Sequence, residues 1–96
     1  MIGFVRYGTR TGEPGGYVFG LYVHPAQAGH DTGRALLSHA EQWLREHGSD
    51  TISLHVFEVN ERARRLYAKA GYAPDGSTRV EPEYQVTEVR LVKALS

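Results

Sequence analysis

The 96-residue sequence predicts one α/β domain of the α+β type, spanning residues 1–96, with a mixed sheet in the order β-β-α-β-α-β-β. Three observations predict this class. Two segments with apolar residues at helical spacing begin near Thr32 and after Asn60, and an alternating segment at residues 51–59 separates them. Short β-branched and aromatic segments lie at both ends of the chain. We expect one right-handed βαβ crossover, between the strands that end at Val23 and Val59.

The N-terminal segment is expected to form a hairpin. Residues 2–7 are rich in aromatic and β-branched side chains and predict a strand, whereas residues 8–16 have the glycine and proline content of a loop. Residues 17–23 predict the second strand. Because this strand is apolar at nearly every position, we expect it to be covered on both faces.

The first helix is expected to begin at about Thr32 and to end before Gly48, which suits a left-handed cap. Its charged residues, Glu41 among them, mostly fall on the outer side. The predicted inner face repeats at i, i+1, i+4, i+7 and i+8 and consists of Leu36, Leu37, Ala40, Trp43 and Leu44.

The second helix is expected to begin after Asn60, which has the side chain of an N-cap, and to stop at Gly71. Its predicted inner face consists of Ala63, Leu66, Tyr67 and Ala70. A turn-rich segment follows at residues 72–76. The chain then ends in a strand at residues 86–95, paired antiparallel with a weaker one around residues 77–81.

Composition narrows the class of function. Eleven basic residues balance eleven acidic ones, so no nucleic-acid or membrane partner is expected from charge. The chain has no cysteine, which excludes disulfides, thiolate metal sites and a cysteine nucleophile. Its histidines show no metal-ligand spacing, so no metal is expected. There is no membrane-spanning apolar run and no signal-peptide pattern, and we expect a cytoplasmic protein.

One stretch carries the first indication of a binding site. The strand at residues 17–23 leads through a polar loop closed by Gly33 into the first helix. Free backbone N–H groups and the positive end of the helix dipole make such a turn suitable for an anionic group such as phosphate. The alternative is a helix capped by Asp31 or Thr32 that binds no ligand.

Three motifs in matching order and spacing then resemble the GNAT superfamily of N-acetyltransferases. The first is LYVHPAQAGHDTGRALLSHAE, which is similar to the family's fourth strand, pyrophosphate loop and third helix. The second is LHVF at residues 54–57, followed by Asn60. The third is NERARRLYAKAGY, with a tyrosine seven residues after the asparagine. Each motif alone is weak, but three in register form a specific signal.

The resemblance implies that acetyl-coenzyme A is the cosubstrate and that its pantetheine arm lies beside the second strand, bonded to backbone groups. The backbone contacts would come from Leu21, Tyr22 and Val23. The pyrophosphate would lie in the loop and helix start made of Ala28, Gly29, His30, Asp31, Thr32, Gly33 and Arg34. Asn60 would cap its helix and also touch the cofactor.

The resemblance also implies a general acid, because the family places the hydroxyl equivalent to that of Tyr67 near the cofactor sulfur. The alternative role for Tyr67 is a core aromatic. His55 lies five residues before Asn60, where some relatives carry a glutamate base, and an imidazole is able to deprotonate an ammonium at neutral pH. A structural histidine is the alternative, and Glu58 is a second candidate base.

Two departures from the family pattern keep a rival function open. Ala28 stands where the family has a polar residue, and Asp31 stands where it has the middle glycine. A carboxylate ~4 Å from a diphosphate costs about 4 kcal/mol at a surface-like dielectric constant. The chain is therefore interpreted as an N-acetyltransferase acting on a primary amine, with a non-catalytic GNAT-like binding or assembly module as the alternative.

The resemblance covers the cofactor half of the family fold, because relatives usually have a strand, two helices and a further strand before the segment matched by residues 2–7. Those helices usually form much of the acceptor site, so the sequence leaves open which small-molecule or peptide amine is the acceptor. The strand with Ile2 and Tyr7 at its ends is then an exposed edge, which favours pairing with another chain. We expect a homodimer or a partner bound at this edge.

Overall fold

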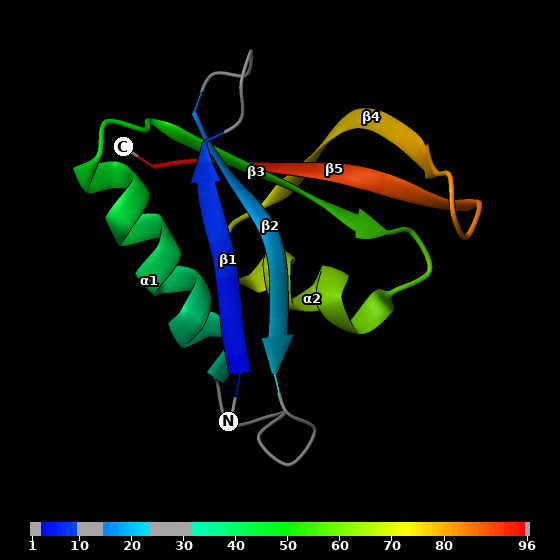
Figure 1. Cartoon of the computed structure of the whole chain (residues 1–96), viewed down its shortest axis with the longest axis horizontal. Coiled ribbons are helices and arrows are strands. Elements are labelled where there is room, and N and C mark those ends of the chain that lie inside the picture. The colour runs from blue at the N-terminus through cyan, green and yellow to red at the C-terminus, as the bar shows by residue number, and fades with distance from the viewer. Residues whose placement is uncertain (1–2, 10–14, 24–31, 96) are drawn as a thin grey trace.

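The computed structural model describes residues 3–9, 15–23 and 32–95, and these form a five-stranded mixed sheet with two helices (Figure 1). The strands lie in the order β1-β2-β3-β5-β4. β2 and β3 are parallel, and the other neighbouring pairs are antiparallel. The predicted element order and crossover are confirmed. The bounds are β1 Gly3–Thr9, β2 Gly16–Val23, α1 Thr32–Glu46, β3 Thr51–Phe57, α2 Glu61–Lys69, β4 Ala73–Glu81 and β5 Val86–Ala94.

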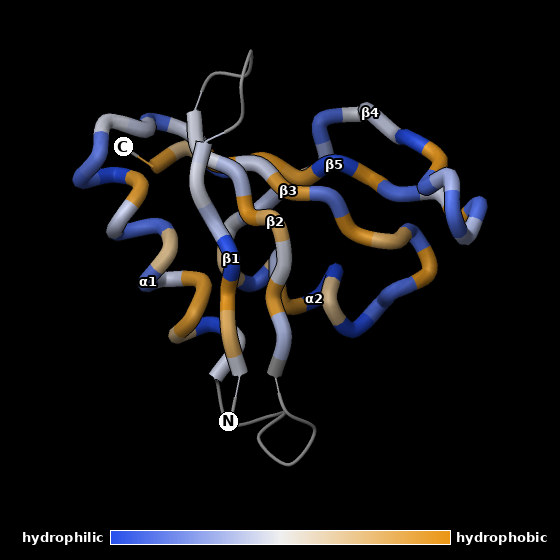
Figure 2. The backbone as a smooth tube through the Cα atoms, in the orientation of Figure 1, coloured by the Kyte–Doolittle hydropathy of each residue, from blue (hydrophilic) through white to orange (hydrophobic). Residues whose placement is uncertain are grey.

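Both helices contribute to a core on one face of the sheet. The alternation predicted for β3 is confirmed, since Ile52, Leu54 and Val56 are buried in one cluster with residues of both helices. Hydrophobic residues recur along α1 and β3 in Figure 2. The remaining cluster members come from β2, the two helices, β5 and the segments that follow α2 and β5: Val18, Leu37, Leu44, Tyr67, Tyr72, Val89, Leu91 and Leu95.

The predicted inner face of α1 is partly wrong. Leu37, Ala40 and Leu44 are buried, but Trp43 is 39% exposed and Glu41, expected on the outside, is only 7% exposed. Glu41 is buried because its carboxylate has two partners from distant parts of the chain. The Tyr72 hydroxyl donates to it at 2.8 Å and Lys93 Nζ at 2.9 Å. Helical periodicity alone carries no information about such partners.

The prediction that β2 is covered on both faces is also wrong. Phe19 is 48% exposed and Tyr22 is 43% exposed, and on β1 the ring of Phe4 stacks with that of Tyr22 at 5.6 Å and is 42% exposed. These aromatic residues lie on the face away from the helices. Within the described residues no element packs over that face, so the all-apolar pattern of β2 does not indicate two-sided burial.

The turn-rich segment after α2 is part of β4, which begins at Ala73 rather than near residue 77. The β4–β5 register is irregular between Pro74 and Thr78, and Gly76 has a φ of +91°. A strand can include such turn-forming residues where an irregularity interrupts the ladder. The sequence pattern was correct about the local backbone and wrong about the strand boundary.

At the other side of the sheet, β1 is the edge strand of the described part of the chain. It pairs with β2 along its whole length. No helix among residues 32–46 and 61–69 is long and apolar enough to cross a membrane.

Candidate functional site

The candidate site begins where β2 and β3 separate. Their parallel ladder covers only residues 16–18 of β2 and 52–54 of β3, although β2 continues to Val23 and β3 to Phe57. The β1–β2 register shifts where Arg6 faces Gly20 and Tyr7 faces Val18, which leaves Phe19 as the extra residue of a bulge. A bulge bends and twists its strand. It lies where the ladder ends, so residues 19–23 have no ladder partner in β3.

The N-terminus of α1 follows β2 in the sequence. Its first turn holds no acidic residue, Gly33 is buried and Arg34 is exposed. The first N–H groups of a helix have no partner within the helix, and together with the helix dipole they favour an anion. Thr32, Gly33 and Arg34 thus lie at a helix start, as expected. The other predicted loop residues, Ala28, Gly29, His30 and Asp31, lie outside the described residues.

The three β2 residues predicted for backbone contacts, Leu21, Tyr22 and Val23, all lie beyond the end of the ladder between β2 and β3. Leu21 packs against the core and Tyr22 turns to the exposed face. β1 pairs with these residues on the outer side, so the side toward β3 is the one available for a ligand strand. This arrangement fits an extended chain that bonds to β2 as an additional strand.

Asn60 is the N-cap of α2, as predicted. Its side-chain Oδ1 accepts a hydrogen bond from the backbone N–H of Ala63 at 3.1 Å. The same residue donates its own N–H to the carbonyl of Phe57 at 3.0 Å, which ties the start of α2 to the end of β3. The cap therefore fixes the direction in which α2 leaves the separated end of β3.

Tyr67 lies in α2 and belongs to the buried core cluster with an exposed fraction of 7%. Its ring contacts that of Tyr72 edge-on at 5.8 Å. Burial raises the pKa of the Tyr67 hydroxyl, so the group keeps its proton at neutral pH. It is placed on the helix side of the sheet and has the protonation state that a proton donor needs.

His55 points to the opposite face, because its neighbours Leu54 and Val56 face the helices. Its Nδ1 lies 2.5 Å from the hydroxyl of Tyr17. His55 is also the first residue of β3 beyond the ladder with β2. Sequence reasoning missed Tyr17, because only the parallel register brings the two residues together. Glu58, the second candidate base, is exposed after the end of β3.

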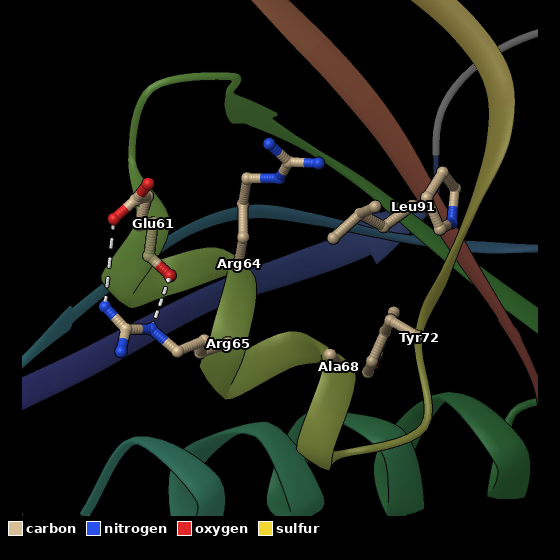
Figure 3. A pocket seen from close by; sticks show the side chains of 7 residues that line it. Glu61, Arg64, Arg65, Ala68, Tyr72 and Leu91 are labelled. Carbon is tan, nitrogen blue, oxygen red and sulfur yellow. Dashed lines mark hydrogen bonds and ion pairs between the residues drawn. The ribbon is translucent and has the colours of Figure 1, made fainter.

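A separate pocket of about 510 Å³ lies between α2 and the strands β4 and β5 (Figure 3). In the close-up, Arg65 turns back to Glu61 while Arg64 points away from it. None of the predicted site residues lines this pocket. Its lining is Glu61, Arg64, Arg65, Ala68, Tyr72, Pro74 and Leu91.

The structure is an α/β fold whose one described parallel pair, β2 and β3, separates beyond Val18 and Leu54, and the helix that follows β2 in the sequence begins at Thr32. The family comparison gives the particular class: residues 1–72 match the acetyltransferase (GNAT) family model, and the chain belongs to that family. A mycothiol acetyltransferase from Propionibacterium freudenreichii is 36% identical over 75 residues, which are 76% of this chain and 24% of the relative.

Solved structures share the fold. The ribosomal-protein-S18-alanine N-acetyltransferase from Escherichia coli superposes with a TM-score of 0.80 at 24% identity, covering 100% of this chain and 63% of that one. An aminoglycoside 6′-N-acetyltransferase in complex with coenzyme A gives 0.82 at 17% identity, with 99% and 67% covered. The chain thus spans about a quarter of the length of the mycothiol acetyltransferase and roughly two thirds of the length of each of the two solved chains. No cluster of metal-ligating side chains occurs in the described ranges.

Proposed function

We propose that this chain is the cofactor-binding half of an N-acetyltransferase, which transfers an acetyl group from acetyl-coenzyme A to a primary amine. The observation that carries the proposal is the early end of the β2–β3 ladder at Val18 and Leu54. It leaves residues 19–23 without a ladder partner in β3, and the next described element in the sequence is the helix that starts at Thr32, whose first turn favours an anion.

The residues present fit the cofactor. Backbone N–H and C=O groups of Leu21, Tyr22 and Val23 would bond the amide groups of the pantetheine arm, in the manner of an added strand. The first turn of α1 would hold the pyrophosphate, with Gly33 allowing close approach of the backbone and Arg34 adding charge. Acetyl-coenzyme A, when bound, supplies the activated acetyl group as a thioester.

Residues on the two faces of the sheet would donate a proton to the leaving thiolate and accept one from the ammonium. The Tyr67 hydroxyl carries a proton at neutral pH, as a donor to a leaving thiolate must, although burial raises its pKa and so makes it a weaker acid. His55, on the other face, is suited to accept a proton from the incoming ammonium. A backbone N–H of β2 would stabilise the negative charge that develops on the acetyl oxygen.

Thermal unfolding with and without acetyl-coenzyme A is the first test. A ligand that binds only the folded state at a hundred times its Kd stabilises by about 2.7 kcal/mol, which is ~10–20 °C in Tm for a domain of this size. Calorimetry with coenzyme A gives the Kd directly. No shift at millimolar cofactor would contradict the proposal.

Turnover is tested next with a panel of amines: spermine, kanamycin, a hexapeptide with a free N-terminus and a lysine amide. Release of the coenzyme A thiol is followed. For an active amine, Tyr67→Phe should lower kcat by roughly 10²-fold, the usual contribution of a general acid, and leave the Kd for acetyl-coenzyme A unchanged. Tyr84→Phe is the matched control, because Tyr84 is 66% exposed on the β4–β5 turn.

A second candidate function, a non-catalytic binding or assembly module, is favoured by Asp31 and Ala28. Both residues depart from the family's pyrophosphate loop. If this function is right, the double change Asp31→Gly and Ala28→Arg should raise coenzyme A affinity by one to three orders of magnitude, since it removes about 1 to 4 kcal/mol of repulsion. An unchanged Kd would favour the enzyme.

We also propose self-association through the β1 edge, where Phe4 is 42% exposed. An exposed strand edge is a template for pairing with a second chain. Light scattering at micromolar concentration should give a dimer mass, and a monomer mass would count against this assembly. A cytoplasmic location stays a prediction.

A further inference from the structure

The pocket between α2 and the strands β4 and β5 has an apolar side and a charged side (Figure 3). The apolar side consists of Leu91 and Tyr72, each 4% exposed, together with Ala68 and Pro74. The hydroxyl of Tyr72 already donates a hydrogen bond to Glu41, so its polar group has a partner within the fold. This side of the pocket therefore offers apolar contact to an occupant.

The charged side comes from the first turns of α2 and contains one carboxylate and two guanidinium groups. Arg65 turns back to Glu61, as Figure 3 shows. Its Nη2 lies 4.0 Å from the Glu61 carboxylate, and its Nε donates to the Glu61 carbonyl at 3.5 Å. The carboxylate of Glu61 is thus matched by Arg65, and Arg64 supplies the remaining charge.

Arg64 is held in place by a neutral group. Its Nη1 donates to the backbone carbonyl of Glu58 at 2.9 Å, and the side chain is half-buried. Within residues 3–9, 15–23 and 32–95, no carboxylate forms an ion pair with Arg64. A guanidinium has five N–H donors in a planar fork, and the carbonyl uses one of them. The lining of the pocket therefore has an excess positive charge at Arg64.

The combination of the two sides selects a class of occupant. A neutral apolar molecule would remove water from Arg64 without supplying a counter-charge, which is unfavourable. A carboxylate or phosphate would pair with the guanidinium through charge-assisted hydrogen bonds. The volume of about 510 Å³ lies within the range of roughly 300–1,000 Å³ that is usual for small-molecule sites. An anion attached to an apolar group satisfies both sides at once.

We propose that this pocket binds a small organic anion, whose carboxylate or phosphate pairs with Arg64 and whose apolar group, about the size of a phenyl ring, packs on Leu91 and Tyr72. None of the residues proposed to hold acetyl-coenzyme A lines the pocket. The anion is therefore a ligand additional to the cofactor, and the inference does not depend on the proposed acetyl transfer.

A ¹H–¹⁵N NMR titration of the full chain tests the site with four probes: 3-phenylpropionate, phenyl phosphate, the neutral 3-phenylpropan-1-ol and inorganic phosphate. The two organic anions should bind at millimolar concentration and shift amide signals of residues 61–74 and of Leu91. The alcohol and inorganic phosphate should bind at least about tenfold more weakly, because each lacks one of the two parts.

Each contrary result with the unaltered chain has a defined meaning. Equal affinity for the alcohol would show an apolar groove without anion recognition, and equal affinity for inorganic phosphate would show a contact with the anion alone. Either result, or no shift of the lining residues with any probe, would overturn the proposal.

Two variants of α2 test the role of the guanidinium. Arg64→Gln should weaken binding of 3-phenylpropionate by roughly tenfold or more. Arg62→Gln should leave the affinity unchanged, because Arg62 is exposed on the same helix and does not line the pocket. An unchanged affinity in Arg64→Gln, or an equal loss in both variants, would overturn the pairing with Arg64.

Competition with the cofactor separates this inference from the proposed function. Saturating coenzyme A should leave the affinity for 3-phenylpropionate unchanged, since the two sets of residues are different. Displacement of the probe would assign the pocket to the cofactor and overturn the proposal. Failure of coenzyme A to bind would instead contradict the proposed function and leave the result for the pocket standing.

Discussion

Replacement of Glu41 by alanine should be one of the most destabilising single changes in α1, although Glu41 was expected on the outer face of that helix. The carboxylate is 7% exposed and accepts hydrogen bonds from the Tyr72 hydroxyl and from Lys93 Nζ. These partners come from the segment after α2 and from β5. Glu41 therefore links three parts of the fold through one buried group.

The magnitude follows from what each partner loses. Tyr72 is 4% exposed, so its hydroxyl would be left without an acceptor away from water, which costs about 1–3 kcal/mol. The Lys93 side chain is 25% exposed, so water replaces part of its lost interaction and the cost is about 1 kcal/mol. Removal of the buried methylene group adds about 1 kcal/mol. We expect a total of about 3–5 kcal/mol, or a Tm lower by ~12 °C or more.

Urea unfolding followed by circular dichroism measures this loss. Glu46→Ala is the matched control, because Glu46 is exposed on the same helix and accepts a side-chain hydrogen bond from Gln42. It should change the stability by less than about 0.5 kcal/mol. A double-mutant cycle with Glu41→Gln and Lys93→Met should give a coupling energy of about 1 kcal/mol or more. A loss below about 1 kcal/mol for Glu41→Ala would refute the reasoning.

Three further changes test the fold and its charges. Gly16→Ala should cost about 1–3 kcal/mol in urea unfolding, because a Cβ would lie 2.6 Å from Cδ1 of the fully buried Leu44. Asn60→Ala should lower the stability by about 1 kcal/mol, since it removes the N-cap of α2. The pKa of Asp75 is lowered, first by the backbone N–H of Ser77 and then by the side chain of Arg90. Its stabilising contribution is therefore present above its ordinary pKa of 3.8 and is lost as the pH falls. Asp75→Ala should therefore destabilise at pH 7, with the difference shrinking as the pH falls below the ordinary pKa of 3.8.

Two of these changes have a control variant in the chain. Gly20→Ala should be neutral within about 0.5 kcal/mol, because no atom lies within 4 Å of its added Cβ. Asn60→Asp should keep most of the cap, since a carboxylate also accepts the Ala63 N–H. A loss in Gly20→Ala equal to that in Gly16→Ala, or a constant effect of Asp75→Ala from pH 2 to 7, would contradict the explanations given.

The local pattern predicted the helices and most strands because their signals are local. The caps at Asn60 and Gly71 lie where expected, the latter with a φ of +100°. The alternation in β3 reports one buried face, and that face is the one toward the helices. Family motifs then located Tyr67 and the helix start at Thr32 on elements that the structure confirms as helices.

Errors arose where a residue's environment depends on a distant segment. Glu41 is buried by partners 31 and 52 residues away in the sequence. Phe19 and Tyr22 are exposed because both helices lie on one face of the sheet, which the composition of β2 cannot reveal. The start of β4 was missed because ladder partners in β5 extend the strand through residues typical of a turn.

By itself the sequence determined the order of elements, the helix caps and the family, since these follow from periodicity, capping chemistry and motif spacing along the chain. Only the tertiary structure decided where the β2–β3 ladder stops and that Tyr17 meets His55 at that point. The reason is physical: the β2–β3 register is set by pairing between segments more than thirty residues apart in the chain, and the bulge in β2 is set by its pairing with β1. The sequence around Tyr17 and the sequence around His55 therefore give no indication that the two side chains are in contact.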